Sequence, residues 1–189
     1  MTWNDMVLNL GCGDNLIQGA VNVDCFKGEG IDETVDLTQM PWKWKEESVD
    51  KIYLTHVLEH FANPKEILEE CHRILKVGGL LEVVVPHSSC AMAVGCLGHY
   101  RTYSYDTLND YLSRPFYYFK KTLFKTKKQE LRWWYGRKTI NVPLPIMMVI
   151  IPMNKILNFL AWLSPQVCEN WWVYLVGGFR EVLYIGEKV

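Results

Sequence analysis

Two glycines and a carboxylate near the start of the chain are the residues best suited to hold a ligand. Gly11 and Gly13 follow an apolar run that ends at Leu10, and Asp24 ends a second apolar run, Val21–Asp24. Glycine adopts positive φ at little cost and has no Cβ to keep a ligand away. A carboxylate at the tip of the neighbouring strand can accept hydrogen bonds from both hydroxyls of a ribose. The spacing therefore predicts a nucleotide-shaped cofactor site at the carboxyl ends of adjacent parallel strands.

Histidines are the side chains best suited to move a proton near this site, because their unperturbed pKa lies near neutrality. Those near its expected mouth are His56, His60, His87 and His99. Residues 56–60 read His-Val-Leu-Glu-His, the spacing of an inverted zinc-protease signature. Imidazoles four residues apart on a helix share a face and can grip zinc. We exclude a protease, because the string falls at a strand-to-helix junction and no further ligand motif follows.

Short apolar runs predict a series of strands around these residues. The expected strands are Val7–Leu10, Val21–Asp24, Glu33–Leu37, Asp50–Thr55 and Leu80–Val85. The last of them reads LLEVVV, a nearly continuous apolar run of the kind that is buried in parallel sheets. Strands that alternate with helices predict an α/β fold with a mostly parallel, doubly wound sheet.

Helices are expected between some of these strands. Asn63 can cap a helix that has Pro64 at its first position, Lys76 in its last turn and Gly78-Gly79 after its end. Between the first two strands only Asp14–Ala20 is available. A parallel crossover usually needs about a dozen residues, so the first helix is expected to have one or two turns at most.

The pattern beyond Pro86 is less regular. The stretch His87–Tyr103 reads as a loop whose length is uncommon unless functional. The elements expected after it are a helix Ser104–Leu112 capped by Ser104, a β-favouring stretch Tyr117–Tyr135, a short amphipathic helix Met153–Leu163 and a final strand Arg180–Gly186.

Composition indicates one globular domain, 1–189, without internal repeats or linkers. Residues 1–60 carry eleven acids and four bases, whereas the remainder carries ten acids and sixteen bases. A cationic second half suits an anionic partner, although solvated lysines explain it equally well. The six cysteines form no Cys-x-x-Cys pair, and the N-terminus lacks the basic region of a signal peptide. These features predict reduced cysteines and a cytoplasmic location. The uncharged run 139–154 is shorter than the ~20 residues of a membrane span and contains prolines.

The order of motifs over residues 6–86 resembles the class I S-adenosylmethionine-dependent methyltransferases, most closely the small methyltransferase type 11 group. After the glycine turn and Asp24 come DLTQMPW from Asp36, ESVDKIYLTHVLEHF from Glu47 and EECHRILKVGGLLEVVVP from Glu69. Each string is ordinary alone, but the set in this order and spacing is specific. The resemblance implies a Rossmann-like fold with a cofactor-binding half, 1–86, and an acceptor-binding or cap half, 87–189.

The resemblance also implies a cofactor, S-adenosylmethionine, with S-adenosylhomocysteine as product. The glycine loop matches the loop that holds its methionine end, Asp24 the ribose-binding acid and Asp36 the acid that takes the adenine amino group, with Leu37 on the ring. His56 matches a position beside the methionine moiety and the substrate. The implied cofactor-binding residues are Asn9, Gly11, Cys12, Gly13, Asp24, Asp36, Leu37 and His56.

Two observations from the residues bear on this assignment. Carboxylates at Asp14, Asp24 and Asp36 favour a sulfonium cation electrostatically. Leu16 leaves the glycine fingerprint of a nicotinamide cofactor incomplete. Asn9 departs from the family, because many relatives have an acid at that position.

The implied reaction is an in-line displacement, in which the protein mainly aligns donor and acceptor. A hydroxyl acceptor also needs a base to take its proton. His56 is the first candidate, because the resemblance places it at the edge of the site, and His99 in the long loop is the second. For each, the alternative is a polar loop residue or a structural histidine.

A divalent metal is not expected, but one alternative stays open. Some O-methyltransferases that act on small-RNA ends or quinone precursors carry a similar Glu-x-x-Glu-His string that binds a divalent ion, which activates the hydroxyl. The corresponding candidates in this chain are His56, Glu59, His60 and His87. The alternative is that Glu59 and His60 make only local hydrogen bonds.

Two later segments suggest partners. Residues 117–138 hold eight Lys and Arg, one acid and seven aromatic residues. Such a pattern suits single-stranded nucleic acid, but a β-ribbon with inward aromatics and outward lysines explains it better, so nucleic acid is not expected. The apolar stretch 139–163 suits peripheral membrane contact, a homodimer face or a lid over the substrate.

The leading hypothesis is therefore O-methylation of a small-molecule or glycan hydroxyl with histidine assistance. Two alternatives remain. One is a non-catalytic module that binds the cofactor or a protein, which Asn9 and the short first crossover would suit. The other is a metal-assisted RNA or quinone-precursor O-methyltransferase.

Overall fold

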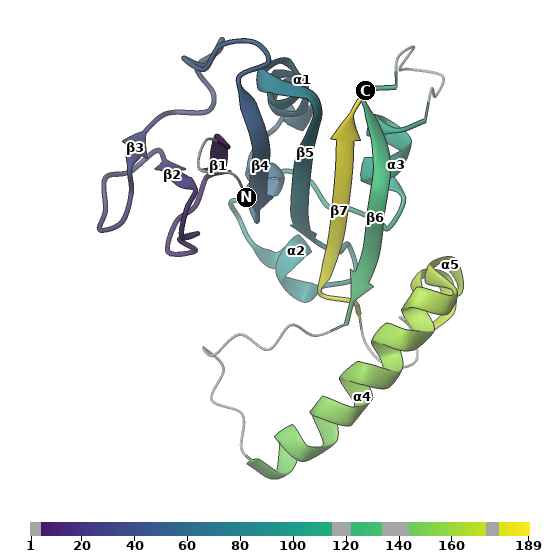
Figure 1. Ribbon diagram of the computed structural model, residues 1–189. Helices are drawn as coiled ribbons and strands as arrows, with labels where there is room; N and C mark the ends of the chain where they lie inside the picture. Colours follow the sequence, from purple (N-terminus) through teal and green to yellow (C-terminus); the bar gives the residue numbers. More distant parts are fainter. Residues whose placement is uncertain (1–4, 115–121, 134–143, 173–177) are drawn as a thin grey trace.

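The structure is a computed structural model that describes residues 5–114, 122–133, 144–172 and 178–189. Its centre is a sheet of seven strands in the order β3-β2-β1-β4-β5-β7-β6 (Figure 1). The strands are β1 Val7–Leu10, β2 Val21–Asp24, β3 Glu33–Thr34, β4 Val49–Thr55, β5 Leu75–Pro86, β6 Phe124–Arg132 and β7 Glu181–Lys188. Strands β1 to β5 pair in parallel, and β7 runs antiparallel to both β5 and β6. This arrangement confirms the predicted Rossmann-like, mostly parallel sheet.

The register of the inner strands brings their carboxyl ends together. Leu10 at the end of β1 pairs with Val23 of β2 on one side and with Leu54 of β4 on the other. Leu8, Leu10 and Leu54 are completely buried, which explains why these strands occupy the middle of the core. The loops after β1, β2 and β4 therefore emerge at one edge of the sheet.

The first crossover contains no helix. Residues 11–20 run from β1 to β2 through turns, so the one or two helical turns expected there do not form. Side-chain amides hold this connection instead: Asn9 Nδ2 donates to the Asn15 carbonyl at 2.8 Å and to Asn22 Oδ1 at 2.9 Å. Asn22 Oδ1 also accepts from the Ile17 N–H at 2.9 Å. Buried amides satisfy the backbone groups that a helix would have paired.

Strand pairing shifts two predicted boundaries. The helix α1 spans Pro64–Ile74, and β5 begins at once because Leu75 pairs with Val49 of β4. The predicted last turn at Lys76 and the glycines after it therefore lie inside β5. Conversely, β3 ends at Thr34 rather than residue 37, because its partner β2 ends at Asp24.

One predicted cap is confirmed in position and the other is wrong. Asn63 is the N-cap residue of α1, but its amide donates to Glu66 Oε1 at 2.7 Å and its side chain makes no capping hydrogen bond. The helix α3 begins at Thr107 with Asp106 at its N-cap, and the Ser104 N–H donates to Thr107 Oγ1 at 2.9 Å. Both α1 and α3 lie behind the sheet in the view of Figure 1.

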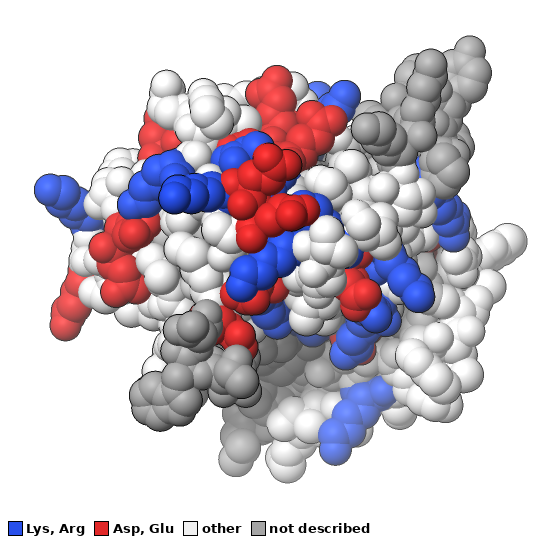
Figure 2. Space-filling model, turned by 45° about the horizontal axis from the view of Figure 1, so that its top comes forward, with Lys and Arg blue, Asp and Glu red and all other residues white. Residues whose placement is uncertain are grey.

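Residues 117–138, the segment rich in basic and aromatic residues, contain the edge strand β6 in their described part. In β6, Phe124 and Leu131 are buried, whereas Lys127 and Lys128 are exposed and paired with carboxylates at 2.6 and 2.7 Å. This pattern fits the predicted inward apolar and outward lysine side chains. Residues 117–121 and 134–138 lie outside the described residues. On the face shown in Figure 2, acidic and basic side chains are intermixed.

A long helix, α4 (Leu144–Leu163), lies beyond the lower end of the sheet in Figure 1, and residues 139–143 before it lie outside the described residues. It contains Pro152 and is followed by α5, Pro165–Val167, and η2, Cys168–Trp172. Among the described residues, no single helix passes the test for a membrane span by length and hydropathy. Two consecutive helical pieces, Met148–Leu163 and Pro165–Trp171, pass it together, with a bend of 116° between them.

Candidate active site

A hollow of about 420 Å³ lies where the segments at the ends of β1, β2, β3 and β4 meet. It brings together five of the predicted cofactor residues, one or two from each of these segments. Its lining residues are Gly11, Asp24, Cys25, Phe26, Val35, Asp36, Leu37, Thr38, His56, Val57, His60 and Phe61.

Gly11 is required by both its backbone and its surroundings. Its φ is 64°, a left-handed conformation that glycine adopts readily. A Cβ at this position would lie 2.7 Å from Val57 Cγ2, closer than van der Waals contact allows. The absence of a side chain at Gly11 therefore lets Val57 close against the glycine loop.

Asp24 is held as a carboxylate by the loops around it. Its Oδ2 accepts from the Gly13 N–H at 2.8 Å, and its Oδ1 accepts from the Phe26 N–H at 3.2 Å. Partial burial raises the pKa of Asp24, but these hydrogen bonds lower the pKa by more, so it lies below its usual value. The ionised group keeps further lone pairs for a ligand hydroxyl.

Asp36 supplies a second carboxylate at the end of the next strand segment. Its Oδ1 accepts from the Thr38 hydroxyl at 2.7 Å and from the Thr38 N–H at 2.9 Å. These two hydrogen bonds hold the pKa of Asp36 below its usual range. The carboxylate is exposed, and its Oδ2 is available to a donor such as an amino group.

These residues fit an adenosine-bearing ligand. The two ionised carboxylates come from successive loops, as hydroxyl and amino groups of such a ligand require. Apolar walls for its ring come from Val35, Leu37 and Phe26, of which the Phe26 ring is 77% exposed and available for stacking. Val57, which packs against Gly11, completes the wall of the hollow.

A second hollow of about 190 Å³ adjoins the first and shares His56 and His60 with it. Its remaining walls come from η1 (Leu58–His60), from the loop after β5 and from the start of β7. The lining residues are His56, Glu59, His60, Pro86, Cys90, Met92, His99 and Arg180. A larger hollow of about 550 Å³ between β6 and α4 shares no residue with these two.

Comparisons with known proteins agree with this geometry. Residues 8–83 match the family model of a methyltransferase domain. Over this part the chain is similar to S-adenosylmethionine-dependent methyltransferases. A comparison with curated protein sequences finds no match.

Solved structures of similar fold align with 98% of this chain. One similar structure is a SAM-dependent methyltransferase from Archaeoglobus fulgidus, with 16% identity, a TM-score of 0.61 and coverage of 98% of this chain and 87% of that one. Another is an S-adenosylmethionine-dependent methyltransferase from Mesorhizobium loti, with 13% identity, a TM-score of 0.54 and coverage of 98% and 91%.

A third similar structure is geranyl diphosphate C-methyltransferase from Streptomyces coelicolor, in complex with Mg²⁺, geranyl diphosphate and S-adenosyl-L-homocysteine. It is 12% identical, with a TM-score of 0.56 and coverage of 98% of this chain and 71% of that one. At these identities the likeness establishes the fold. The division into a cofactor half and an acceptor half stays a prediction.

Three predicted cofactor residues, Asn9, Cys12 and Gly13, shape the loop from outside the lining of the hollow. Asn9 is only 1% exposed and holds the first crossover, as described above. The Cys12 N–H donates to the Val23 carbonyl at 3.0 Å, and the Gly13 N–H donates to Asp24. Asp14 is exposed and also lies outside the lining.

His56 lies between two buried carboxylates. Its Nε2 is 3.0 Å from Glu181 Oε1, and its Nδ1 is 3.5 Å from Glu59 Oε1. Burial lowers the pKa of His56, but the two carboxylates raise it by more, to about 9. A raised pKa favours the protonated ring at neutral pH, which does not suit a general base. The role of His56 as the base stays a prediction.

His87 lies away from the candidate metal group predicted from the sequence. Its Nδ1 is 2.6 Å from Ser89 Oγ, and its Nε2 is 2.9 Å from Glu169 Oε1. The ring is 1% exposed, and both of its nitrogens are engaged. His87 is therefore a structural histidine that joins β5 to η2.

Sequence reasoning missed Glu181 and the dual position of His60. Glu181 is 125 residues from His56, and no local motif connects them. The available signal was an acid at the start of an otherwise apolar strand, which needs a buried partner. His60 lines both hollows because η1 turns it back toward β4.

Proposed function

We propose that this methyltransferase transfers the methyl group of S-adenosylmethionine to a hydroxyl group of a small-molecule or glycan acceptor. The observation that supports this proposal most is the junction of the two hollows. The cofactor hollow carries carboxylates suited to adenosine, and the adjoining hollow carries a carboxylate and imidazoles suited to a hydroxyl. Both share the walls formed by His56 and His60.

When bound, S-adenosylmethionine supplies a methyl carbon activated by its sulfonium centre. Asp24 and Asp36 bind its adenosine part and add negative charge near the cation. The main task of the chain is to hold donor and acceptor in line. The His56 imidazolium, fixed by Glu59 and Glu181, keeps the wall between the two hollows in one conformation.

A hydroxyl acceptor must also lose its proton. Glu59, His60 and His99 face the second hollow, and we propose that these three groups assist that loss. The hollow, about 190 Å³, is smaller than the roughly 300–1,000 Å³ of pockets that enclose a drug-sized ligand. This size favours an acceptor that inserts one hydroxyl-bearing ring, as the terminal residue of a glycan does.

Cofactor binding can be tested by calorimetric titration with S-adenosylhomocysteine. Asp24→Ala removes both carboxylate oxygens, and we expect at least tenfold weaker binding for each charged hydrogen bond lost, about 1.5–3 kcal/mol each. Asp14→Ala, at an exposed residue outside the lining, is the matched control and should bind like the wild type.

The absence of any binding of either the methyl donor or its product to the wild-type chain would contradict the proposed function. Incubation with radiolabelled methyl donor and fractionated cell extract then identifies the acceptor. Label in a fraction that is sensitive to glycosidase supports a glycan. Cofactor binding without transfer to any fraction would favour a binding module instead.

We further propose that α4 contacts a membrane surface. Its outer face exposes large apolar side chains, and from Met148 to Leu163 its one charged residue is Lys155. Trp162 and Trp171 are 69% and 72% exposed on either side of the bend that follows α4. Tryptophan favours the boundary between lipid and water, which supports a lipid surface over a second copy of the chain.

We also propose a cytoplasmic location. All six cysteines are free, and Cys25 and Cys96 are exposed. Exposed thiols that stay unpaired are typical of a reducing compartment.

A further inference from the structure

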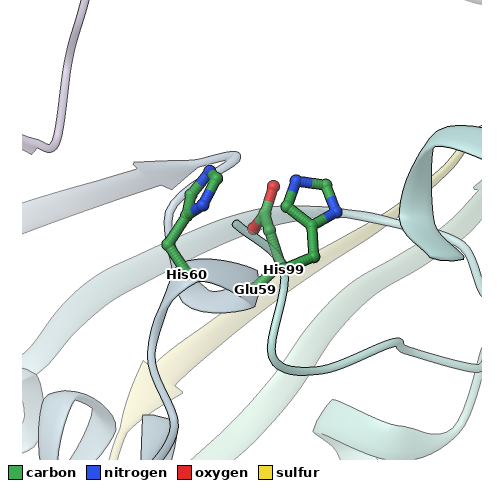
Figure 3. A group of neighbouring side chains, drawn as sticks. All are labelled: Glu59, His60 and His99. Atoms are coloured by element: carbon green, nitrogen blue, oxygen red, sulfur yellow. The ribbon is translucent and has the colours of Figure 1, made fainter. Parts of the chain in front are cut away.

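We propose that Glu59, His60 and His99 form a binding site for a divalent first-row metal ion such as zinc. One ligand atom from each of these side chains lies within 4.8 Å of the others. Figure 3 shows the Glu59 carboxylate between the two imidazole rings. The inference deepens the proposed function, since it assigns a chemical role to the groups that line the acceptor hollow.

The Glu59 carboxylate has an oxygen that needs a partner. Glu59 is 1% exposed, and its Oε1 is paired with His56. Its Oε2 is buried and has no hydrogen-bond partner among the described residues. A buried carboxylate oxygen without a partner is costly, and a cation beside it removes that cost.

Hydrogen bonds determine which ring nitrogen of each histidine is left to bind a metal ion. His60 Nδ1 is 3.0 Å from the Gly98 carbonyl oxygen, and His99 Nδ1 is 3.2 Å from the Ala93 carbonyl oxygen. A carbonyl oxygen only accepts, so each Nδ1 donates in this hydrogen bond, and Nε2 is the ring nitrogen left to bind an ion. Metal-binding histidines are oriented in this way by hydrogen bonds from the other ring nitrogen.

The backbone holds the three groups together before any ion binds. The Tyr100 N–H donates to the Glu59 carbonyl at 2.7 Å, and the Arg101 guanidinium donates to the Ala62 carbonyl at 3.0 Å. With the bond from His60 to Gly98, these contacts tie the loop that carries His99 to η1 and the residues after it. The long loop after Pro86 is therefore ordered around the proposed site.

The donor set indicates the kind of ion. Two imidazoles and one carboxylate suit zinc and similar first-row ions, with remaining positions open to water or substrate. Bonds of about 2.0–2.2 Å place such donor atoms roughly 3–4 Å apart. Small rotations of the side chains close the present spread of 4.8 Å to that range.

The proposed ion has a defined place in the reaction. Its ligands line the second hollow, so an open position would face the acceptor. A hydroxyl oxygen bound there would lose its proton to solvent water more readily, because a divalent cation stabilises the alkoxide, and the three side chains would act by holding the ion. The proposed set differs from the one predicted from the sequence: His99 belongs to it, whereas His56 and His87 are held by carboxylates.

The test is a titration of the chelator-treated full chain with Zn²⁺ and, separately, with Co²⁺ followed by visible absorption. We expect one high-affinity site per chain and the d–d bands of coordinated cobalt. His99→Asn and Glu59→Gln should each weaken binding at least tenfold. His72→Asn, at a histidine that packs on Phe124, and Cys96→Ser, at an exposed thiol, should leave binding unchanged.

Melting curves distinguish a loss of metal binding from misfolding of the variant. Zinc should raise the melting temperature of the wild type and of Cys96→Ser, but not of His99→Asn, if all three melt cooperatively without metal. The proposal is overturned if the wild type binds no zinc, or if Glu59→Gln and His99→Asn both bind it like the wild type. Titration with S-adenosylhomocysteine on the same samples tests the proposed function separately.

Discussion

At the scale of single residues, the two glycines of the first loop make unequal demands. Gly11 has φ of 64° and no room for a Cβ, whereas Gly13 has φ of 46° and open space around it. Conformation alone therefore restricts Gly13, while conformation and packing against Val57 together restrict Gly11.

This difference predicts which of two alanine variants loses more stability and more cofactor binding. Gly13→Ala should cost about 1 kcal/mol, the penalty of a left-handed alanine. Gly11→Ala should cost more and should weaken S-adenosylhomocysteine binding at least tenfold, because Val57 must move out of the wall of the hollow. Denaturant unfolding and calorimetry measure the two effects.

The double variant Gly11→Ala/Val57→Ala separates packing from conformation. It should recover part of the loss in binding, because the atom that the new Cβ meets is removed. Equal effects at both glycines would show that packing against Val57 contributes nothing.

At the scale of elements, a partly buried ion pair on α1 makes hydrogen bonds that hold the loop before β4. Glu70 Oε1 accepts from the Trp42 N–H at 2.8 Å and from Arg73 Nη2 at 2.6 Å. Arg73 Nη2 also donates to the Trp44 carbonyl at 3.0 Å. The hydrogen bonds from Arg73 hold the pKa of Glu70 below its ordinary value of 4.5, although partial burial opposes them.

The lowered pKa fixes the direction of a pH effect on stability. The folded state prefers the Glu70 carboxylate, so the stabilisation is fully present above the unfolded pKa and is lost as pH falls through the folded pKa. Glu70→Gln should lower the free energy of unfolding by about 1.5–3 kcal/mol at pH 7. The difference from the wild type should shrink as pH falls below about 4.5.

The neighbouring residue offers a matched control. Glu69 is exposed on the same helix, 3.6 Å from Lys65. Glu69→Gln should change stability by at most about 0.5 kcal/mol, as expected for an exposed pair. Urea unfolding of both variants across this pH range checks the prediction, and equal losses for both would contradict it.

Most of the inner strands could be predicted from the sequence. Strands β1, β2, β4 and β5 were recognisable because each buries a short apolar run between turn residues. The glycine loop and Asp24 follow directly from those strand ends, so the cofactor hollow was predictable as well.

Other features depend on contacts between distant parts of the chain. The pair of His56 with Glu181 joins β4 to β7, and the pair of His87 with Glu169 joins β5 to η2. The first crossover replaces its expected helix by the amides of Asn9 and Asn22, which local propensity does not report. Such side-chain partners determine which histidines are already paired with a carboxylate. A single sequence does not reveal these long-range pairs.

At the scale of the whole molecule, α4 lies beyond the lower end of the sheet in Figure 1. Leu157 and Ala161 are buried, whereas Phe159 and Trp162 are exposed. The proposed membrane contact would use this exposed side of α4.

Flotation with vesicles of phosphatidylcholine and phosphatidylglycerol tests this arrangement. The wild type should bind, and Phe159→Ser/Trp162→Ser should bind at least tenfold more weakly, because a large apolar side chain contributes about 1.5–3 kcal/mol on burial. Val77→Ser, at an exposed apolar residue at the start of β5, should bind like the wild type. A concentration-dependent dimer that the double variant abolishes, without vesicle binding, would assign this face to a second copy.

The wall shared by the two hollows has a consequence for divergence among relatives. A substitution at His56 or His60 alters both hollows at once. Cys90, Met92 and Arg180 line the second hollow alone. Under the proposed function, selection for a new acceptor would therefore act through those three residues and leave the use of the methyl donor intact.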